Sequence, residues 1–145
     1  MSVEQVARDV VSNMTNIDKL KTMVTADAMA SGGVLPQPIP MMEALKVSAG
    51  LATAFPDLKF DIKQVTVNGN KATVNAQWSG TNTGPLSLPV PGMSTIPPTG
   101  KKVSVKDAYV VTVQGDKVSH FEVNSPADGG IPAALAQMGV KMPGM

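Results

Sequence analysis

The chain has 145 residues, with 12 basic and 11 acidic side chains and a net charge of +1. This near balance, with aromatic residues at only 3%, argues against nucleic-acid binding, which requires a basic surface and usually stacking rings. The absence of cysteine excludes disulfides, a cysteine nucleophile and thiolate metal sites. The length predicts a single domain over residues 1–145, with a flexible tail at 140–145.

No apolar run approaches the length of about 18 residues that a membrane-spanning helix needs, so we expect no membrane partner. Residues 1–11 carry Glu4, Arg8 and Asp9 and lack an apolar core, which is unlike a signal peptide. The expected location is therefore the cytoplasm. With one histidine and no cysteine, a zinc site is not expected.

Apolar spacing predicts three helices in the first half of the chain. The first covers residues 3–14, and a short second helix covers residues 18–24. Residues 31–40 are rich in glycine and proline and are predicted to form a loop. The third helix covers residues 41–55, and it ends there because Pro56 disfavours a helical conformation at the residue before it.

After Pro56 the helical spacing gives way to strict alternation, which predicts antiparallel strands joined largely by hairpins. The first strand changes face in its middle and is followed by an Asn-Gly-Asn turn around Gly69. A proline-rich loop is predicted at 86–100, and a short last helix at 131–138. The predicted strands are residues 60–67, 72–79, 103–113 and 118–123.

Helices followed by strands indicate an α+β fold. We expect the N-terminal helices to pack in the concave face of a curved antiparallel sheet, and the curvature to leave a pocket between the two layers.

Four short motifs, taken in their order and spacing, resemble the SnoaL-like polyketide cyclase family. They are Phe55-Pro56-Asp57-Leu58, Ser79-Gly80-Thr81-Asn82-Thr83-Gly84-Pro85, Pro97-Pro98-Thr99-Gly100-Lys101 and Gly115-Asp116-Lys117-Val118-Ser119-His120-Phe121. The resemblance covers residues 3–139. It implies a cone-shaped α+β barrel with an apolar cavity, shared with ketosteroid isomerase, scytalone dehydratase and nuclear transport factors.

The resemblance also implies an activity. SnoaL-like cyclases close a ring by an intramolecular aldol reaction, in which a carboxylate moves the proton without a metal or an organic cofactor. A small hydrophobic carbonyl compound as ligand and a homodimer formed through the outer sheet face are further implications. Two positions differ from the family pattern: Asn82 stands where histidine is common, and Glu122 stands where aspartate is more usual.

The last predicted strand carries a histidine, a carboxylate and an amide. Alternation places one set of residues on the same face: Val118, His120, Glu122 and Asn124. If that face lines the cavity, apolar surroundings raise the pKa of Glu122 and suit it to act as a general base, with His120 as its partner. If it does not, these side chains lie at the cavity mouth or in the dimer interface.

Asp107 lies in a row of valines on the neighbouring strand, on the same face as Tyr109. It either orients His120, acts as the catalytic acid, or pairs with a lysine at the surface. Tyr109 is either a hydrogen-bond donor to an oxyanion or a packed core residue. The other candidates for ligand contact are Trp78, Asn82, Asn124, Met42 and Phe55.

Three functions remain open from the sequence. The first is a cyclase or isomerase that acts on a small carbonyl compound. The second is a non-catalytic ligand-binding or dimerisation module of the same fold. The third is an enzyme like ketosteroid isomerase, which needs a carboxylic acid and a tyrosine that face one carbonyl group. If His120 and Glu122 point out of the fold into solvent, the enzyme hypothesis built on them fails. If they point inward and no polar group lies opposite, a binding role gains support.

Overall fold

The computed structural model describes residues 2–14, 16–32, 37–87, 95–126 and 129–140. The helices are α1 (Val3–Ser12), α2 (Ile17–Thr22), α3 (Met41–Ala54) and α4 (Gly130–Gln137). The strands are β1 (Val24–Gly32), β2 (Ile39–Pro40), β3 (Lys59–Asn68), β4 (Lys71–Thr81), β5 (Lys102–Gln114) and β6 (Lys117–Val123). The predicted α+β class is confirmed.

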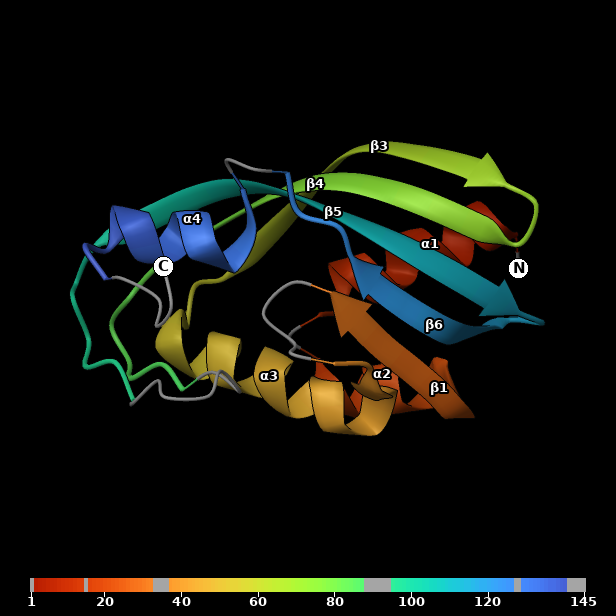
Figure 1. The fold of residues 1–145 in the computed structure, drawn as a ribbon, viewed down its shortest axis with the longest axis horizontal. Coiled ribbons are helices and arrows are strands. Elements are labelled where there is room, and N and C mark those ends of the chain that lie inside the picture. Colours follow the sequence, from red (N-terminus) through yellow and green to blue (C-terminus); the bar gives the residue numbers. More distant parts are fainter. Residues whose placement is uncertain (1, 15, 33–36, 88–94, 127–128, 141–145) are drawn as a thin grey trace.

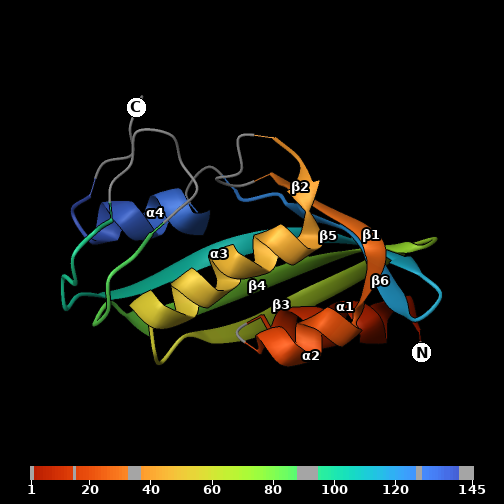
Figure 2. The ribbon, with the colours of Figure 1, turned by 90° about the horizontal axis from the view of Figure 1, so that it is seen from below.

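Within the described ranges, the strands form one curved, unclosed sheet in the order β2-β1-β6-β5-β4-β3 (Figure 1). Neighbouring strands are antiparallel except β1 and β6, which run parallel. Helix α1 packs against β3 and β4, and α4 packs against β5. Figure 2 shows α3 running across the sheet and α4 at one end of it.

The segment that follows α2 corrects the sequence prediction. Val24, expected in the second helix, begins β1, and Gly32, expected in a loop, ends it. The apolar residues of β1 do not alternate regularly, because its register against β6 shifts between Val24 and Met29. The predicted loop also contains β2, whose two residues pair with the end of β1. The sheet therefore has two more strands than the sequence pattern indicated.

The predicted hairpins are confirmed. Gly69 and Gly115 both adopt a φ of 65°, which glycine tolerates at no steric cost, in the turns between β3 and β4 and between β5 and β6. The predicted change of face in the first of these strands is a register shift between Ile62 and Gln64. Local turn chemistry and alternation were sufficient to predict this part of the sheet.

Two predicted segments lie partly outside the described residues. In the proline-rich loop, Leu86 and Ile96 form an isolated bridge, and residues 88–94 are outside the described ranges. The predicted tail is described only at Val140. None of the helices in the described ranges is long and apolar enough to cross a membrane.

The sheet has an inner face, which the helices cover, and an outer face. On the inner face, Trp78 of β4 pairs with Val105 of β5, and Ala76 pairs with Asp107. The residues between them, such as Lys106, project from the outer face.

Two apolar clusters lie against the inner face. One joins α1, α2 and the start of α3 to the sheet and includes Tyr109 and Phe121. The other joins the end of α3 and α4 to the far half of β4 and β5 and includes Phe55, Trp78 and Leu135. The boundary between the clusters therefore falls between Trp78 and Tyr109.

We predict that Gly32→Ala destabilises the protein more than Gly69→Ala. Both glycines have positive φ, which costs an alanine about 1–2 kcal/mol. A Cβ at Gly32 would also collide with the backbone carbonyl of Val123, whereas a Cβ at Gly69 would meet no atom within 4 Å. Chemical denaturation of the two variants measures the difference. Equal losses would show that β6 yields to the added methyl group without cost.

Candidate functional site

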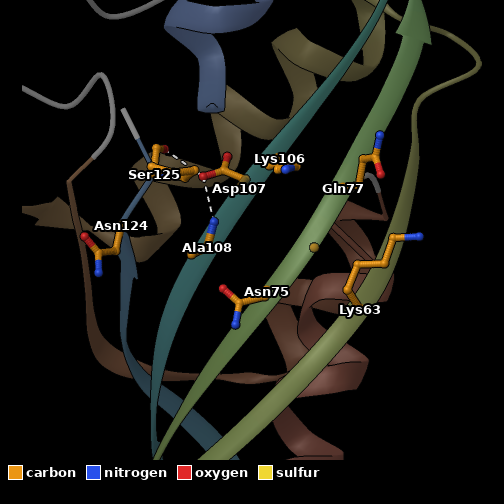
Figure 3. Close-up of a pocket in the computed structure, with 10 residues that line it drawn as sticks. Lys63, Asn75, Gln77, Lys106, Asp107, Ala108, Asn124 and Ser125 are labelled. Atoms are coloured by element: carbon orange, nitrogen blue, oxygen red, sulfur yellow. Dashed lines mark hydrogen bonds between the residues drawn. The ribbon is translucent and has the colours of Figure 1, made fainter. Parts of the chain in front are cut away.

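The carboxylate of Asp107 is buried at the boundary of the two clusters. Asp107 is only 6% exposed, and four donors surround its two oxygens. The Ser125 hydroxyl donates to Oδ1 at 2.7 Å, and the Ala108 backbone N–H donates to the same oxygen at 2.9 Å (Figure 3). Trp78 Nε1 and the Tyr109 hydroxyl each donate to Oδ2 at 3.3 Å.

Burial and hydrogen bonding act in opposite directions on this carboxyl group. Burial raises the pKa of Asp107 above its ordinary value, and the hydrogen bonds from Ser125, Ala108, Trp78 and Tyr109 partly oppose that rise. Burial, together with the nearby Asp107 carboxylate, raises the pKa of Tyr109 well above 10. The Tyr109 hydroxyl is therefore protonated at neutral pH, and it donates its hydrogen to Oδ2 of Asp107.

All five aromatic residues of the chain lie in a connected group around Asp107. The ring of Tyr109 lies 5.2 Å from that of Phe121 and 6.5 Å from that of Phe60. The Phe55 ring meets the Trp78 ring edge-on at 5.9 Å. A chain with few aromatic residues thus concentrates its flat apolar surface around its one buried carboxylate in the described ranges.

An open hollow of about 610 Å³ lies on the other side of β5. Its wall includes the outer-face residues Asn75, Gln77, Lys106 and Asn124, and it extends to Asp107 and Ser125 (Figure 3). The hollow lies on the outer face of the sheet and is distinct from the apolar cavity predicted between helices and sheet. That cavity remains a prediction.

The structure corrects the expected orientation of the last strand. The register between β5 and β6 shifts, so that Val118 pairs with Val113 on the inner face while His120 pairs with Thr112 on the outer face. Strict alternation therefore placed Val118 and His120 together incorrectly. His120 Nε2 instead lies 2.9 Å from the hydroxyl of Ser31 on β1.

Glu122 and Asn124 follow His120 on the outer face. Both are exposed, and Glu122 pairs with Val110. The condition under which Glu122 would act as a base inside the fold is therefore not met. Asn124 lines the outer hollow rather than the interior.

Asn82, expected to contact a ligand, is fully buried and uses its side chain to hold loops together. Its Nδ2 donates to the carbonyl oxygens of Ala54 and Gly84 at 3.3 and 2.9 Å. Its Oδ1 accepts from the Thr99 backbone N–H and hydroxyl at 2.7 and 2.9 Å. Both Nδ2 hydrogens and both Oδ1 lone pairs are thus engaged within the protein.

Other contacts between the family motifs are also structural. Asp57 accepts from the Thr81 backbone N–H at 2.7 Å and from its hydroxyl at 3.0 Å, and the backbone bond lowers the pKa of Asp57. A Cβ at Gly84 would collide with the Thr53 carbonyl at the end of α3. These motifs therefore specify how the loops meet α3.

The remaining candidates separate into two groups. Phe55, Trp78 and Tyr109 are at most 3% exposed and lie around Asp107 as described. Met42 is 45% exposed on α3, away from the buried core. In the described ranges, no three histidine, aspartate or glutamate side chains gather into a group that could hold a metal ion.

Ser125 is the residue of this site that sequence reasoning missed. It follows the last predicted strand, in a segment that carries no periodic pattern. Its contact with Asp107 joins residues 18 positions apart and arises only when β6 lies beside β5. The nearest sequence signal was the isolated Asp107 in a row of valines.

Comparison with known proteins identifies the family. A model of the family "SnoaL-like polyketide cyclase" matches residues 2–122. The chain belongs to the SnoaL-like polyketide cyclase family. Family and fold together support a function of the cyclase or isomerase type. A search of curated proteins found no match to this SnoaL-like chain.

Solved structures show the same fold at low sequence identity. A protein from Jannaschia sp. CCS1 assigned to the SnoaL-like polyketide cyclases has a TM-score of 0.75 at 20% identity, covering 94% of this chain and 90% of its own. IdmH from Streptomyces antibioticus, assigned as a polyketide cyclase, has a TM-score of 0.72 at 17% identity, covering 97% and 100%. A Catenulispora acidiphila protein with a ketosteroid isomerase-like fold, in complex with trimethylamine, has a TM-score of 0.68 at 16% identity, covering 93% and 92%.

We predict that Asn82→Ala lowers the free energy of unfolding of this SnoaL-like protein by about 2–4 kcal/mol, because it leaves buried loop groups without partners. Asn75→Ala is the matched control, since Asn75 is exposed on the same sheet, and its effect is expected within about 0.5 kcal/mol. Denaturant unfolding measures both. Similar values for the two variants would contradict the structural role of Asn82.

Proposed function

We propose that this protein catalyses proton transfer at the carbon next to a carbonyl group in a small hydrophobic compound, with Asp107 as the general base. The observation that carries the proposal is the buried carboxylate of Asp107 between the Trp78 indole and the Tyr109 hydroxyl. A carboxyl group whose pKa is raised by burial is a stronger base when ionised than an exposed one.

The reaction begins when Oδ2 of Asp107 takes a proton from the acidic carbon. The electron pair of the broken C–H bond moves into the carbonyl group and forms an enolate. As Oδ2 becomes protonated, the Tyr109 hydroxyl gives up its hydrogen bond to that oxygen and donates to the enolate oxygen instead, which stabilises the charge that develops there. Trp78 Nε1 donates to the same oxygen of Asp107 and holds the carboxyl group in place.

Ring closure follows if the substrate carries a second carbonyl group. The enolate carbon attacks that carbonyl carbon, a C–C bond forms, and the proton held by Asp107 passes to the new alkoxide. Isomerisation follows instead if the proton returns to another carbon of the conjugated system. Neither route needs a cofactor, because the proton and the electron pair both come from the substrate.

The substrate that we propose is apolar with at least one carbonyl group. The rings of Phe55, Phe60 and Phe121 surround the two donors and the base with apolar surface. Such rings bury a hydrophobic ligand favourably and orient a flat one by stacking. Its binding site is the cavity that the family resemblance implies between helices and sheet.

A second candidate is a non-catalytic ligand-binding module. Each oxygen of Asp107 already accepts two hydrogen bonds from the protein, as expected for a carboxylate that only stabilises the core. The two candidates differ in whether Asp107 changes its protonation state during function.

We predict that Asp107→Asn slows the exchange of the α-hydrogens of β-tetralone in deuterium oxide, relative to the unaltered protein, by about 100-fold to 10,000-fold, the usual effect of losing a general base. β-Tetralone serves as the probe because it joins an aromatic ring to an acidic CH₂ group. Glu122→Gln is the matched control and leaves the rate unchanged, because Glu122 is exposed on the outer face. Proton NMR follows the exchange.

The pH profile of this exchange provides a further check. Asp107 acts as a base only when ionised, and its pKa is raised, so the rate falls as the pH drops through a value above the ordinary 3.8. An equal rate in Asp107→Asn and the unaltered protein would overturn the catalytic proposal. Retained binding of β-tetralone together with no exchange by the unaltered protein would favour the binding module.

We also propose that two copies associate through the outer sheet face. The hollow there exposes polar side chains of β4, of β5 and of the residue after β6, namely Asn75, Lys106 and Asn124. These side chains can make reciprocal hydrogen bonds with a second copy. Sedimentation velocity is expected to show a species of twice 15.0 kDa. A single species of 15.0 kDa at micromolar concentration would contradict the homodimer.

A further inference from the structure

We infer that Ser125 is a positioning residue for Asp107: its hydroxyl holds Oδ1 and leaves Oδ2 as the oxygen that takes the substrate proton. This inference rests on the proposed function and assigns a task to each carboxylate oxygen. It also gives Ser125 and α4 a part in building the site.

The two oxygens of Asp107 are held unequally. Oδ1 accepts short hydrogen bonds from the Ser125 hydroxyl at 2.7 Å and from the Ala108 N–H at 2.9 Å. Oδ2 accepts only long ones, at 3.3 Å, from Trp78 and Tyr109. Short bonds to a charged acceptor are the stronger ones, so Oδ1 is fixed and Oδ2 is the freer base.

Ser125 reaches Asp107 because β6 ends beside β5 at this point. The last strand-like bond between them is donated by Asn124 N–H to the Ala108 carbonyl at 2.8 Å. The chain then turns away from the sheet, and the next side chain, Ser125, faces the carboxylate instead of a strand neighbour. The Ala108 N–H that also bonds Oδ1 follows Asp107 directly on β5.

Two glycines let the chain pass close to this contact. A Cβ at Gly130 would collide with the Ser125 hydroxyl, and Gly130 has a φ of 70°, which alanine rarely adopts. A Cβ at Gly129 would collide with the Lys106 carbonyl. The segment that begins α4 is thus packed directly on the Ser125–Asp107 pair.

Helix α4 anchors the other end of this segment. The Gln137 amide makes two hydrogen bonds to the backbone of Ser104, accepting from its N–H at 2.9 Å and donating to its carbonyl at 3.0 Å. The Gln137 side chain thereby satisfies backbone groups of β5 at Ser104, beyond the part of β5 that pairs with β6. Leu135 packs in the same cluster as Trp78, so α4 supports donors to both oxygens.

Few charged groups surround the carboxylate. Tyr109 is the titratable group that contacts it, and the lysines at 63 and 106 line the hollow on the other side of β5. Lys63 is paired with Asp61. Helix α4 has no titratable side chain. The Ser125 hydroxyl is therefore a major local influence that favours the ionised form of Asp107, and burial opposes it.

The test is a carbon-13 NMR titration of the Asp107 carboxyl group in the intact chain, assigned with Asp107→Asn. Loss of a hydrogen bond to the ionised form raises a carboxyl pKa, so Ser125→Ala is expected to raise the pKa of Asp107 by about one to two units. Ser125→Thr keeps the hydroxyl and restores the original value. Ser119→Ala, in a serine whose hydroxyl bonds Thr112 instead, leaves it unchanged.

Catalysis supplies the second measurement. In Ser125→Ala, the pH at which the rate of β-tetralone exchange falls on acidification (the acid limb of the pH profile) rises together with the carboxyl pKa. In Ser125→Thr, this pH returns to its original value. A purely structural serine would lower the yield of folded protein without moving this limb. Should Ser125→Ala not fold, Ser125→Cys keeps the volume with a weak donor and is expected to shift the pKa in the same direction.

The outcomes separate this inference from the proposed function. An unmoved Asp107 pKa in a folded Ser125→Ala or Ser125→Cys variant overturns the positioning role, whatever the activity. An unchanged exchange rate in Asp107→Asn overturns the proposed function, whatever the pKa. A pKa shift of similar size in Ser119→Ala would also overturn the inference, because the effect would then not be specific to Ser125.

Discussion

Burial of a carboxylate sets the strongest physical constraint on this structure. An ionised group loses its water when it enters a protein core, and it is tolerated only where donors replace that water. Asp107 meets this condition with donors from β4, from its own strand and from the segment after β6. Each of these elements must be in its final place before the carboxylate is satisfied.

This requirement ties the two halves of the core together. Trp78 belongs to the cluster beneath α4, and Tyr109 belongs to the cluster beneath α1, yet both donate to one oxygen of Asp107. Asn82 acts similarly, because its amide joins the end of α3 to two loops. Polar groups thus connect parts that apolar packing alone would leave free to shift.

The family motifs and the buried carboxylate occupy different places in this protein. The contacts of Asp57 with Thr81, and of Asn82 with Thr99, explain why those motifs accompany the fold. The buried acid lies outside them, in the middle of β5. Resemblance through loop motifs therefore identifies architecture, and candidate reacting groups have to be sought from burial and hydrogen bonding.

By itself, the sequence determined the α+β class, the long helices and the hairpins, because these follow from local periodicity and turn chemistry. The placement of Asp107 and Tyr109 on one face was predictable for the same reason. Tertiary structure decided the rest: the register shift that turns His120 and Glu122 outward, the parallel pairing of β1, and the approach of Ser125 to Asp107. Register and long-range contact depend on how separate strands meet, and no local pattern encodes that.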